Sequence, residues 1–217
     1  MLRMIRTIDP YIAQEAAAVL SRNDPVLKAV IASVGICTIT PHTDYYRELV
    51  DSIISQQLSV KAAATIFRRF LDLFEGIFPV PEAILEKSIE ELRTAGLSAA
   101  KANYIRDLAQ HILDGIVQLE KLDTLSNEAI ITELTAVKGI GEWTAHMFLM
   151  FCMGRTDVLP HGDLGIRNGV QKLYHLGAVP SPAGVVKIAQ DNNWHPYESI
   201  ASWYVWKSLD NEPKTVG

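Results

Sequence analysis

The sequence contains few cysteines. Cys37 and Cys152 are the two among 217 residues, and they lie far apart along the chain. Two cysteines cannot form a four-cysteine zinc site or iron–sulfur cluster. We expect both to be reduced thiols without a disulfide, as is usual in the cytoplasm.

Long apolar stretches are also missing. No run reaches the roughly 18 residues that a membrane-spanning helix needs. The first residues, MLRMIRTIDPYIAQ, place charges among the apolar positions. This pattern lacks the continuous apolar region of a secretory signal, so we expect no membrane association.

Positive charge is in short supply, because the net charge is −5 and the isoelectric point is about 5.7. A protein that coats nucleic acid carries a broad basic surface, so that class is disfavoured. A protein that contacts a few phosphates through backbone N–H groups remains possible.

Apolar residues are plentiful, at 48% of the chain, and most recur at helical spacing. No segment reads as a strand, and no repeat of fixed period is present. The sequence therefore predicts an all-α fold. The expected helices include 45–54, 60–74, 99–115 and 142–153, with further helices opened by Asp24, Ser126 and Asp163 as N-caps.

The segment from Leu134 to Phe148, LTAVKGIGEWTAHMF, places two glycines around one apolar residue between two amphipathic helices. Gly139 and Gly141 can adopt backbone angles closed to other residues, and they leave N–H groups exposed beside a helix N-terminus. Such a turn binds phosphate without net positive charge. A plain αα-hairpin with a glycine turn is the alternative. The wider pattern resembles the helix-hairpin-helix motif of DNA-binding proteins.

Asp163 follows Gly141 by 22 residues, in the segment VLPHGDLGIRNGV. This segment resembles the aspartate-bearing loop of the 3-methyladenine DNA glycosylase II family. The resemblance extends over about 20–209 and includes ISQQLSVKAA, GLSAAKANYI and WHPYESIASWYVWKSL. It corresponds to the compact form of the family, which lacks an N-terminal β-domain.

The resemblance implies a helix-hairpin-helix DNA glycosylase fold, with two helical subdomains and a cleft between them. One subdomain would combine 1–39 with 156–217. The other would hold 40–155, including a plug loop and the hairpin at about 134–148.

Asp163 would be the catalytic residue. A carboxylate at a helix N-terminus can stabilise the positive charge that develops on a sugar as its glycosidic bond breaks, and it can orient the attacking water. Lyases of the superfamily carry a nucleophilic lysine two residues after the second hairpin glycine. This chain has Trp143 there, so the resemblance implies hydrolysis without strand cleavage.

Aromatic side chains would bind the excised base, because alkylation at N3 or N7 of a purine leaves a positive charge that favours aromatic faces. The family pattern places Trp143 and Trp206 in the substrate pocket, with Tyr204 and Trp203 as further candidates. Met147 stands where the inducible bacterial member has a tyrosine. Each of these aromatics could instead be a core residue.

DNA contacts would come from two loops. The segment Ser55–Ser59, SQQLS, matches the plug loop that fills the gap left by the flipped base. Its wedge would be Gln57 or Leu58. The alternative is a polar helix break with solvated charges. The predicted DNA-binding residues are Gln57, Leu58, Ser59, Lys61, Lys138, Gly139, Ile140 and Gly141, with Arg68 and Lys101 as additional candidates.

No cofactor would be required. The resemblance implies that the main-chain carbonyls of Thr135, Val137 and Ile140 hold a Na+ or K+ ion that bridges to a DNA phosphate. The partner would be duplex DNA with alkylated bases, bound by a monomer wherever the genome lies (the cytoplasm and nucleoid, or the nucleus of a eukaryote). A glycosylase for deaminated or oxidised bases, a non-catalytic DNA-binding module and a helical protein-interaction domain are the alternatives.

Overall fold

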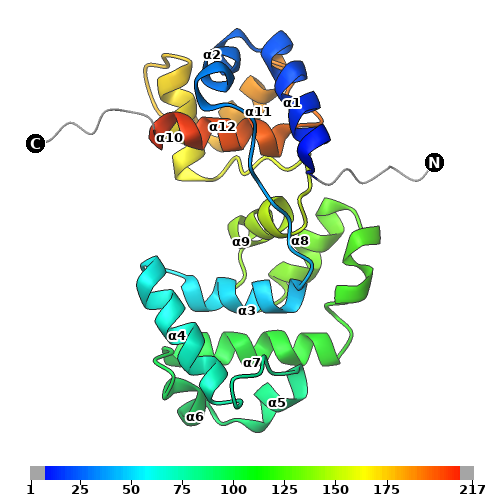
Figure 1. Ribbon diagram of the computed structural model, residues 1–217, viewed down its shortest axis with the longest axis vertical. Helices are drawn as coiled ribbons and strands as arrows, with labels where there is room; N and C mark the ends of the chain where they lie inside the picture. Colours follow the sequence, from blue (N-terminus) through cyan, green and yellow to red (C-terminus); the bar gives the residue numbers. More distant parts are fainter. Residues whose placement is uncertain (1–7, 211–217) are drawn as a thin grey trace, which may run out of the picture. The chain divides into compact units, whose positions relative to one another are not determined.

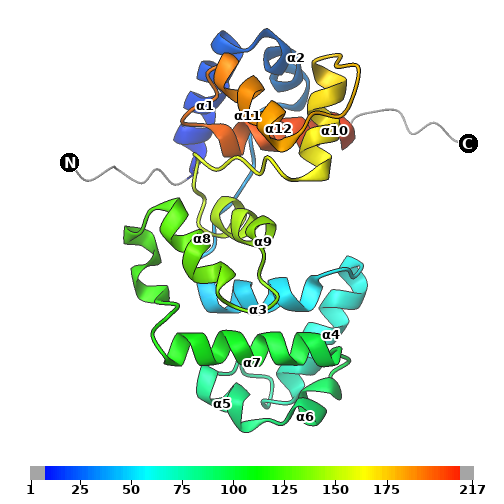
Figure 2. The same ribbon diagram turned by 180° about the vertical axis from the view of Figure 1, so that it is seen from behind.

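The computed structural model describes residues 8–210, and every regular element in that range is a helix. The all-α prediction is therefore confirmed. The chain divides into two compact units, which Figures 1 and 2 show from opposite sides. Unit 1 comprises Met1–Pro41 and Leu149–Gly217, and unit 2 comprises His42–Phe148.

The boundary at which the chain leaves unit 2 and returns to unit 1 lies between residues 148 and 149. The sequence analysis placed this boundary between residues 155 and 156. One reason is a backbone hydrogen bond of 2.8 Å from the amide of Ile8 to the carbonyl of Gly154, which ties this segment to the N-terminal part of unit 1. No sequence pattern signals a contact between residues so far apart.

Unit 2 is built around the long helix α7 (Ala99–Leu113). This helix packs against α3 (Tyr45–Ser55), α5 (Pro81–Glu86) and α6 (Ile89–Arg93). Figures 1 and 2 both show α3 on one side of α7 and the two short helices on the other. The remaining elements are α4 (Val60–Asp72), η1 (Leu119–Thr124), α8 (Asn127–Thr135) and α9 (Glu142–Met147).

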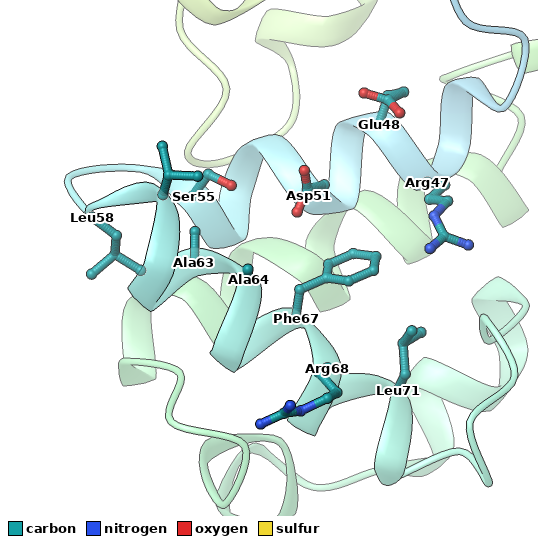
Figure 3. A pocket seen from close by; sticks show the side chains of 11 residues that line it. Arg47, Glu48, Asp51, Ser55, Leu58, Ala63, Ala64, Phe67, Arg68 and Leu71 are labelled. Atoms are coloured by element: carbon teal, nitrogen blue, oxygen red, sulfur yellow. The ribbon is translucent and has the colours of Figure 1, made fainter.

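Helix α4 packs beside α3, and a pocket of about 490 Å³ opens along the pair (Figure 3). The guanidinium group of Arg47 lies 5.1 Å from the ring centre of Phe67 and 5.5 Å from that of Phe78. Asp51 is half-buried beside it, and burial raises the pKa of this carboxyl more than Arg47 and Ser55 lower it.

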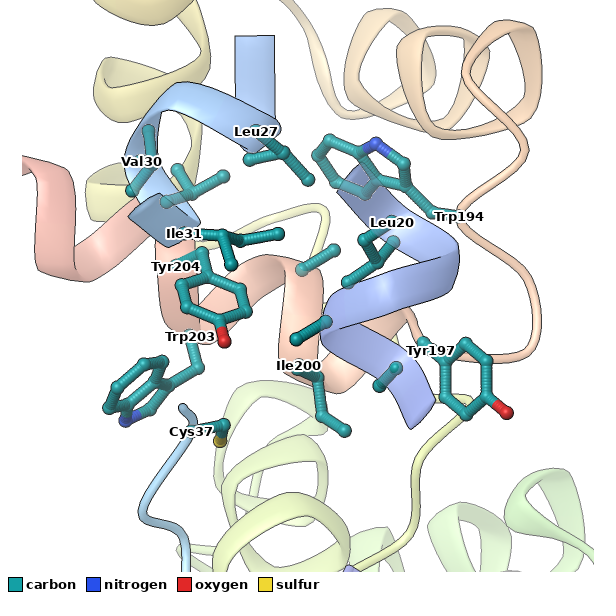
Figure 4. Close-up of a cluster of buried hydrophobic side chains, with 14 of the residues drawn as sticks. Leu20, Leu27, Val30, Ile31, Cys37, Trp194, Tyr197, Ile200, Trp203 and Tyr204 are labelled. Carbon is teal, nitrogen blue, oxygen red and sulfur yellow. The ribbon is translucent and has the colours of Figure 1, made fainter. Parts of the chain in front are cut away.

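Unit 1 surrounds α12 (Glu198–Asp210), which packs against α1 (Pro10–Asn23), α2 (Pro25–Val34) and α10 (Leu164–Leu173). Figure 4 shows the core of this unit, where side chains from 20–37 pack together with side chains from 194–204. Helix α11 (Pro182–Asp191), which the sequence analysis did not identify, covers α10.

Asp24 is a fully buried carboxylate in this core. It caps α2 as predicted, accepting hydrogen bonds from the amides of Val26 (2.9 Å) and Leu27 (3.1 Å). It also accepts one from the indole N–H of Trp194 (2.8 Å) and one from the hydroxyl of Tyr174. One side chain thus connects the start of α2 to segments about 150 residues away.

The helix predicted over 142–153 is wrong in its second half. Helix α9 ends at Met147, and the chain continues as a π-helix, η2 (Phe148–Cys152). The π-helix is a single turn that directly continues α9, and so short a segment does not show in the spacing of apolar residues. Across residues 8–210, no helix has the length and apolarity needed to cross a bilayer.

Candidate active site

Asp163 is the N-cap of α10, as predicted. Its Oδ1 accepts a hydrogen bond of 2.8 Å from the amide of Ile166 and one of 3.0 Å from the indole Nε1 of Trp206. The side chain is half-buried. The helix start and the indole together hold one carboxylate oxygen in place, so the group has a defined orientation.

Gly165 provides the room for this arrangement. A Cβ atom at this position would lie 3.0 Å from Oδ1 of Asp163 and 3.0 Å from Nε1 of Trp206. The ring of Phe151 also packs against this indole, with ring centres 5.9 Å apart and an interplanar angle of 32°. The sequence analysis missed both residues. The glycine two positions after the aspartate was the available signal for the first.

The three aromatic residues of α12 that the sequence offered for the substrate pocket lie in different surroundings. Trp206 lies against Asp163, whereas Tyr204 is fully buried and donates a hydrogen bond of 2.9 Å to the carbonyl of Gly35. Tyr204 therefore packs in the core of unit 1 and offers no surface to a base. Trp203 is also buried, at 8% exposure.

Trp143 and Met147 belong to unit 2, where they lie one turn apart on α9. The side chain of Trp143 is 53% exposed, which is unusual for tryptophan. Met147 is half-buried. These residues share a helix face and can present one apolar surface.

The hairpin turn between α8 and α9 is tight. Gly139 has φ of 84°, and a Cβ atom there would lie 2.2 Å from the ring of Tyr104. Gly141 differs from the prediction, because its φ of −95° is open to any residue. Apart from the adjoining residues of the chain, no atom lies within 4 Å of where its Cβ would stand. Gly139 is thus required by conformation and packing, and Gly141 leaves open space at the start of α9.

Lys138 lies on the same turn with its side chain 76% exposed. Its backbone amide donates to Oδ2 of Asp107 at 2.8 Å, and its ammonium group lies 3.1 Å from Oδ1. Burial alone would raise the pKa of Asp107. The hydrogen bonds from Lys138, with the charges of His111 and Lys138, outweigh burial and hold that pKa below its usual range.

The plug loop, Ser55–Ser59, connects α3 to α4. Gln57 has φ of 57°, and Leu58 is 38% exposed. The hydroxyl of Ser59 caps α4 by accepting from the amide of Ala62 at 3.3 Å. Lys61 and Arg68 are both exposed on α4. Leu58 and Arg68 line the pocket of Figure 3.

Lys101 is placed differently from the prediction of a phosphate contact. Its ammonium group donates to the carbonyls of Ile54 and Gln56, each at 2.7 Å. Burial lowers the pKa of this amine, because a charged group loses hydration there.

The predicted site residues form two groups. Asp163 and Trp206 lie in unit 1, and the plug loop, the hairpin, Trp143 and Met147 lie in unit 2.

Known proteins share this architecture. Residues 50–192 match the family model described as HhH-GPD superfamily base excision DNA repair protein. DNA-3-methyladenine glycosylase 1 of Schizosaccharomyces pombe is 40% identical over 165 residues, covering 75% of this chain and 72% of that protein.

Two solved structures are also similar. DNA-3-methyladenine glycosidase from Bacillus halodurans is 34% identical with a TM-score of 0.83, covering 96% of this chain and 94% of that one. The S. pombe 3-methyladenine DNA glycosylase (Mag1) in complex with abasic DNA is 36% identical with a TM-score of 0.77, covering 90% and 97%. The chain therefore belongs to the 3-methyladenine DNA glycosylase family of the HhH-GPD superfamily.

Proposed function

We propose that this protein is a monofunctional DNA glycosylase that excises alkylated bases, of the 3-methyladenine and 7-methylguanine type, from duplex DNA in base excision repair. The observation that carries the proposal is the Asp163 carboxylate, held at the N-terminus of α10 by Ile166 and Trp206. The names of the similar proteins, DNA-3-methyladenine glycosylases, support the substrate class.

The chemistry follows from the charge of the carboxylate. As the bond between C1′ and the base nitrogen breaks, its electron pair leaves with the base and positive charge develops on the sugar. A carboxylate fixed beside that charge stabilises the transition state. A water molecule then adds to C1′, and Asp163 orients it and accepts its proton. The products are the free base and an abasic site.

Trp143 supports hydrolysis over lyase chemistry. It occupies the position of the nucleophilic lysine in the lyase branch, and an indole cannot form a Schiff base with the sugar. Its exposed face, with Met147 one turn away, suits a flipped purine that carries positive charge.

The proposed DNA contacts come from the plug loop, the hairpin turn and the start of α4. Gln57 and Leu58 are exposed at the tip of the plug loop, where one of them can fill the gap in the stack. The open space around Gly141 lets a phosphate approach the start of α9. The exposed Lys61 and Lys138 add positive charge, and Ser59, Gly139 and Ile140 shape the two loops. These contacts need no broad basic surface and suit a chain with net charge −5.

A monovalent cation at the hairpin belongs to the same proposal. Helix α8 ends at Thr135, and the last carbonyls of a helix have no partner within it. The carbonyl of Val137 accepts from the amide of Ile140 at 3.1 Å, which curls the chain so that the carbonyls of Thr135, Val137 and Ile140 follow one tight turn. Neutral oxygens of this kind suit Na+ or K+. When bound, the ion would supply positive charge for a phosphate. We propose a monomer acting wherever the genome lies.

The test is the release of bases from methylated duplex DNA, followed by electrophoresis of a duplex with one methylated purine. Release of methylated purines, with strand breaks revealed by hot alkali alone, is the expected result. Direct nicking would assign the chain to lyase chemistry. Binding without release would make it a DNA-binding module, and both outcomes contradict the proposal.

A further inference from the structure

One face of α7 contacts both loops that the proposed function brings to DNA. Lys101, Tyr104 and Asp107 follow each other at intervals of three residues, so their side chains leave the helix on one side. Lys101 reaches the plug loop, and the other two reach the hairpin. All of these residues belong to unit 2.

Lys101 anchors the plug loop at the point where α3 ends. Its ammonium group donates to the carbonyl of Ile54 in the last turn of α3 and to that of Gln56, the C-cap residue, at 2.7 Å each. The last carbonyls of a helix lack partners and carry partial negative charge, so a cation is favoured there. Gln57, with its left-handed backbone, follows directly. The direction in which the loop leaves α3 is therefore set by Lys101.

Tyr104 and Asp107 anchor the hairpin turn. The Tyr104 ring fills the space that a side chain at position 139 would need. Asp107 accepts hydrogen bonds from both the backbone amide and the ammonium group of Lys138. The turn is thus held by packing on one residue and by a charged acceptor on its neighbour.

The two loops also contact each other directly. Nε2 of Gln56 donates a hydrogen bond of 2.8 Å to the carbonyl of Gly139. Plug loop, hairpin and α7 therefore form a closed triangle of contacts. A shift of one loop relative to the other would break at least one of these three sets of contacts.

We infer that this face of α7 fixes the register between the plug loop and the hairpin, and that Lys101 is a positioning residue for base flipping. The inference rests on the proposed function, in which the hairpin holds a phosphate while the plug enters the stack. A wedge displaced by about 1 Å from the gap loses much of its effect on the rate. Because the amine of Lys101 is held by two carbonyls, it acts on the loop and not on a phosphate.

The test uses Lys101→Met, which keeps the length of the side chain and removes its donors. Lys121→Met is the matched control, because Lys121 lies on η1 and donates to the side chain of Gln118, the N-cap residue of that helix, away from both loops. In the free protein, amide hydrogen exchange at residues 55–59 should quicken about tenfold in Lys101→Met and stay unchanged in Lys121→Met. Unchanged exchange in Lys101→Met would overturn the inference, whether or not the protein is a glycosylase.

The second readout is catalytic. Single-turnover excision by Lys101→Met should fall about tenfold. Affinity for undamaged duplex should stay within about threefold, with an unchanged salt slope. The fluorescence of 2-aminopurine beside the lesion should show reduced unstacking. Lys101→Arg, which retains donors for both carbonyls, should recover most of the rate.

A salt slope reduced by about one would instead identify Lys101 as a phosphate contact and overturn the inference.

Gln56→Met removes the hydrogen bond between the plug loop and the hairpin. It provides an independent test if Lys101→Met folds poorly. Gln56→Met should also quicken amide hydrogen exchange at residues 55–59 and slow excision. The double variant with Lys101→Met should slow excision by less than the product of the two single-variant effects. If the double variant slowed excision by the full product of the two single effects, the two residues would act independently, and this would contradict the inference that they fix one register.

Discussion

The two hairpin glycines make a matched pair for a substitution experiment, because they are two residues apart and receive the same change. In Gly139→Ala the new methyl group would stand 2.2 Å from the ring of Tyr104, at a residue with φ of 84°. A left-handed alanine costs about 1–2 kcal/mol, and overpacking against a ring costs about 1–3 kcal/mol. The free energy of unfolding of Gly139→Ala should therefore fall by about 2–5 kcal/mol.

Gly141→Ala should behave differently. Its φ of −95° suits alanine, and apart from the adjoining residues of the chain no atom lies within 4 Å of the new methyl group. Alanine is a poorer N-cap than glycine but reduces the entropy of the unfolded chain, so stability should change by less than about 1 kcal/mol. Its methyl group would occupy the space proposed for a phosphate, so affinity for duplex DNA should weaken about tenfold.

Urea unfolding and fluorescence anisotropy with a labelled duplex measure the two effects. Gly139→Ala measured in a Tyr104→Ala background separates clash from backbone strain, because without the ring it should cost the strain component alone. Equal stability losses at the two glycines would refute the structural reasoning. Normal DNA affinity in Gly141→Ala would refute the proposed phosphate contact.

Three further predictions concern groups whose environment is well defined. Asp24→Ala removes a cap and leaves the buried indole N–H of Trp194 and the half-buried hydroxyl of Tyr174 without their acceptor, so stability should fall by about 3–6 kcal/mol. Asp9→Ala, which loses an exposed cap contact to Ile12, should cost about 1 kcal/mol, and equal costs in urea unfolding would contradict the network. Because the folded pKa of Asp107 is lowered, its carboxylate stabilises the fold above the pKa of the unfolded chain. The stability difference between the native protein and Asp107→Asn should therefore be constant above about pH 5 and shrink as the pH falls through the folded pKa. Urea unfolding at several pH values measures this difference, and a difference that grew in acid would contradict the prediction. Burial raises the pKa of Cys37 to about 11, so a disulfide reagent at pH 7 should modify this thiol far more slowly in the native protein than in urea, and equal rates would place it at the surface.

Much of the fold was predictable because its signals are local. Asp24, Ser126 and Asp163 each stand directly before a helix, and the structure shows each as an N-cap with a bonded side chain. The family followed from motifs of a few residues each. The comparisons confirm it.

The environment of the site was harder to predict because it depends on distant contacts. Tyr204 and Trp206 are two residues apart, and periodicity does not tell which of them faces Asp163. The structure places one in the core and the other on the carboxylate. Lys101 looked like a free cation because its carbonyl partners lie about 45 residues earlier in the chain.

The carboxylate of Asp163 is the group on which the proposed reaction depends, and Asp163→Asn tests it most directly. Asparagine is as good an N-cap as aspartate, so the variant should fold and bind duplex DNA with an affinity within about threefold of the native protein. The measurement is the single-turnover rate of base release from a duplex with one methylated purine. We predict a loss of about a thousandfold or more, whereas base release at the native rate by a folded Asp163→Asn protein would contradict the account.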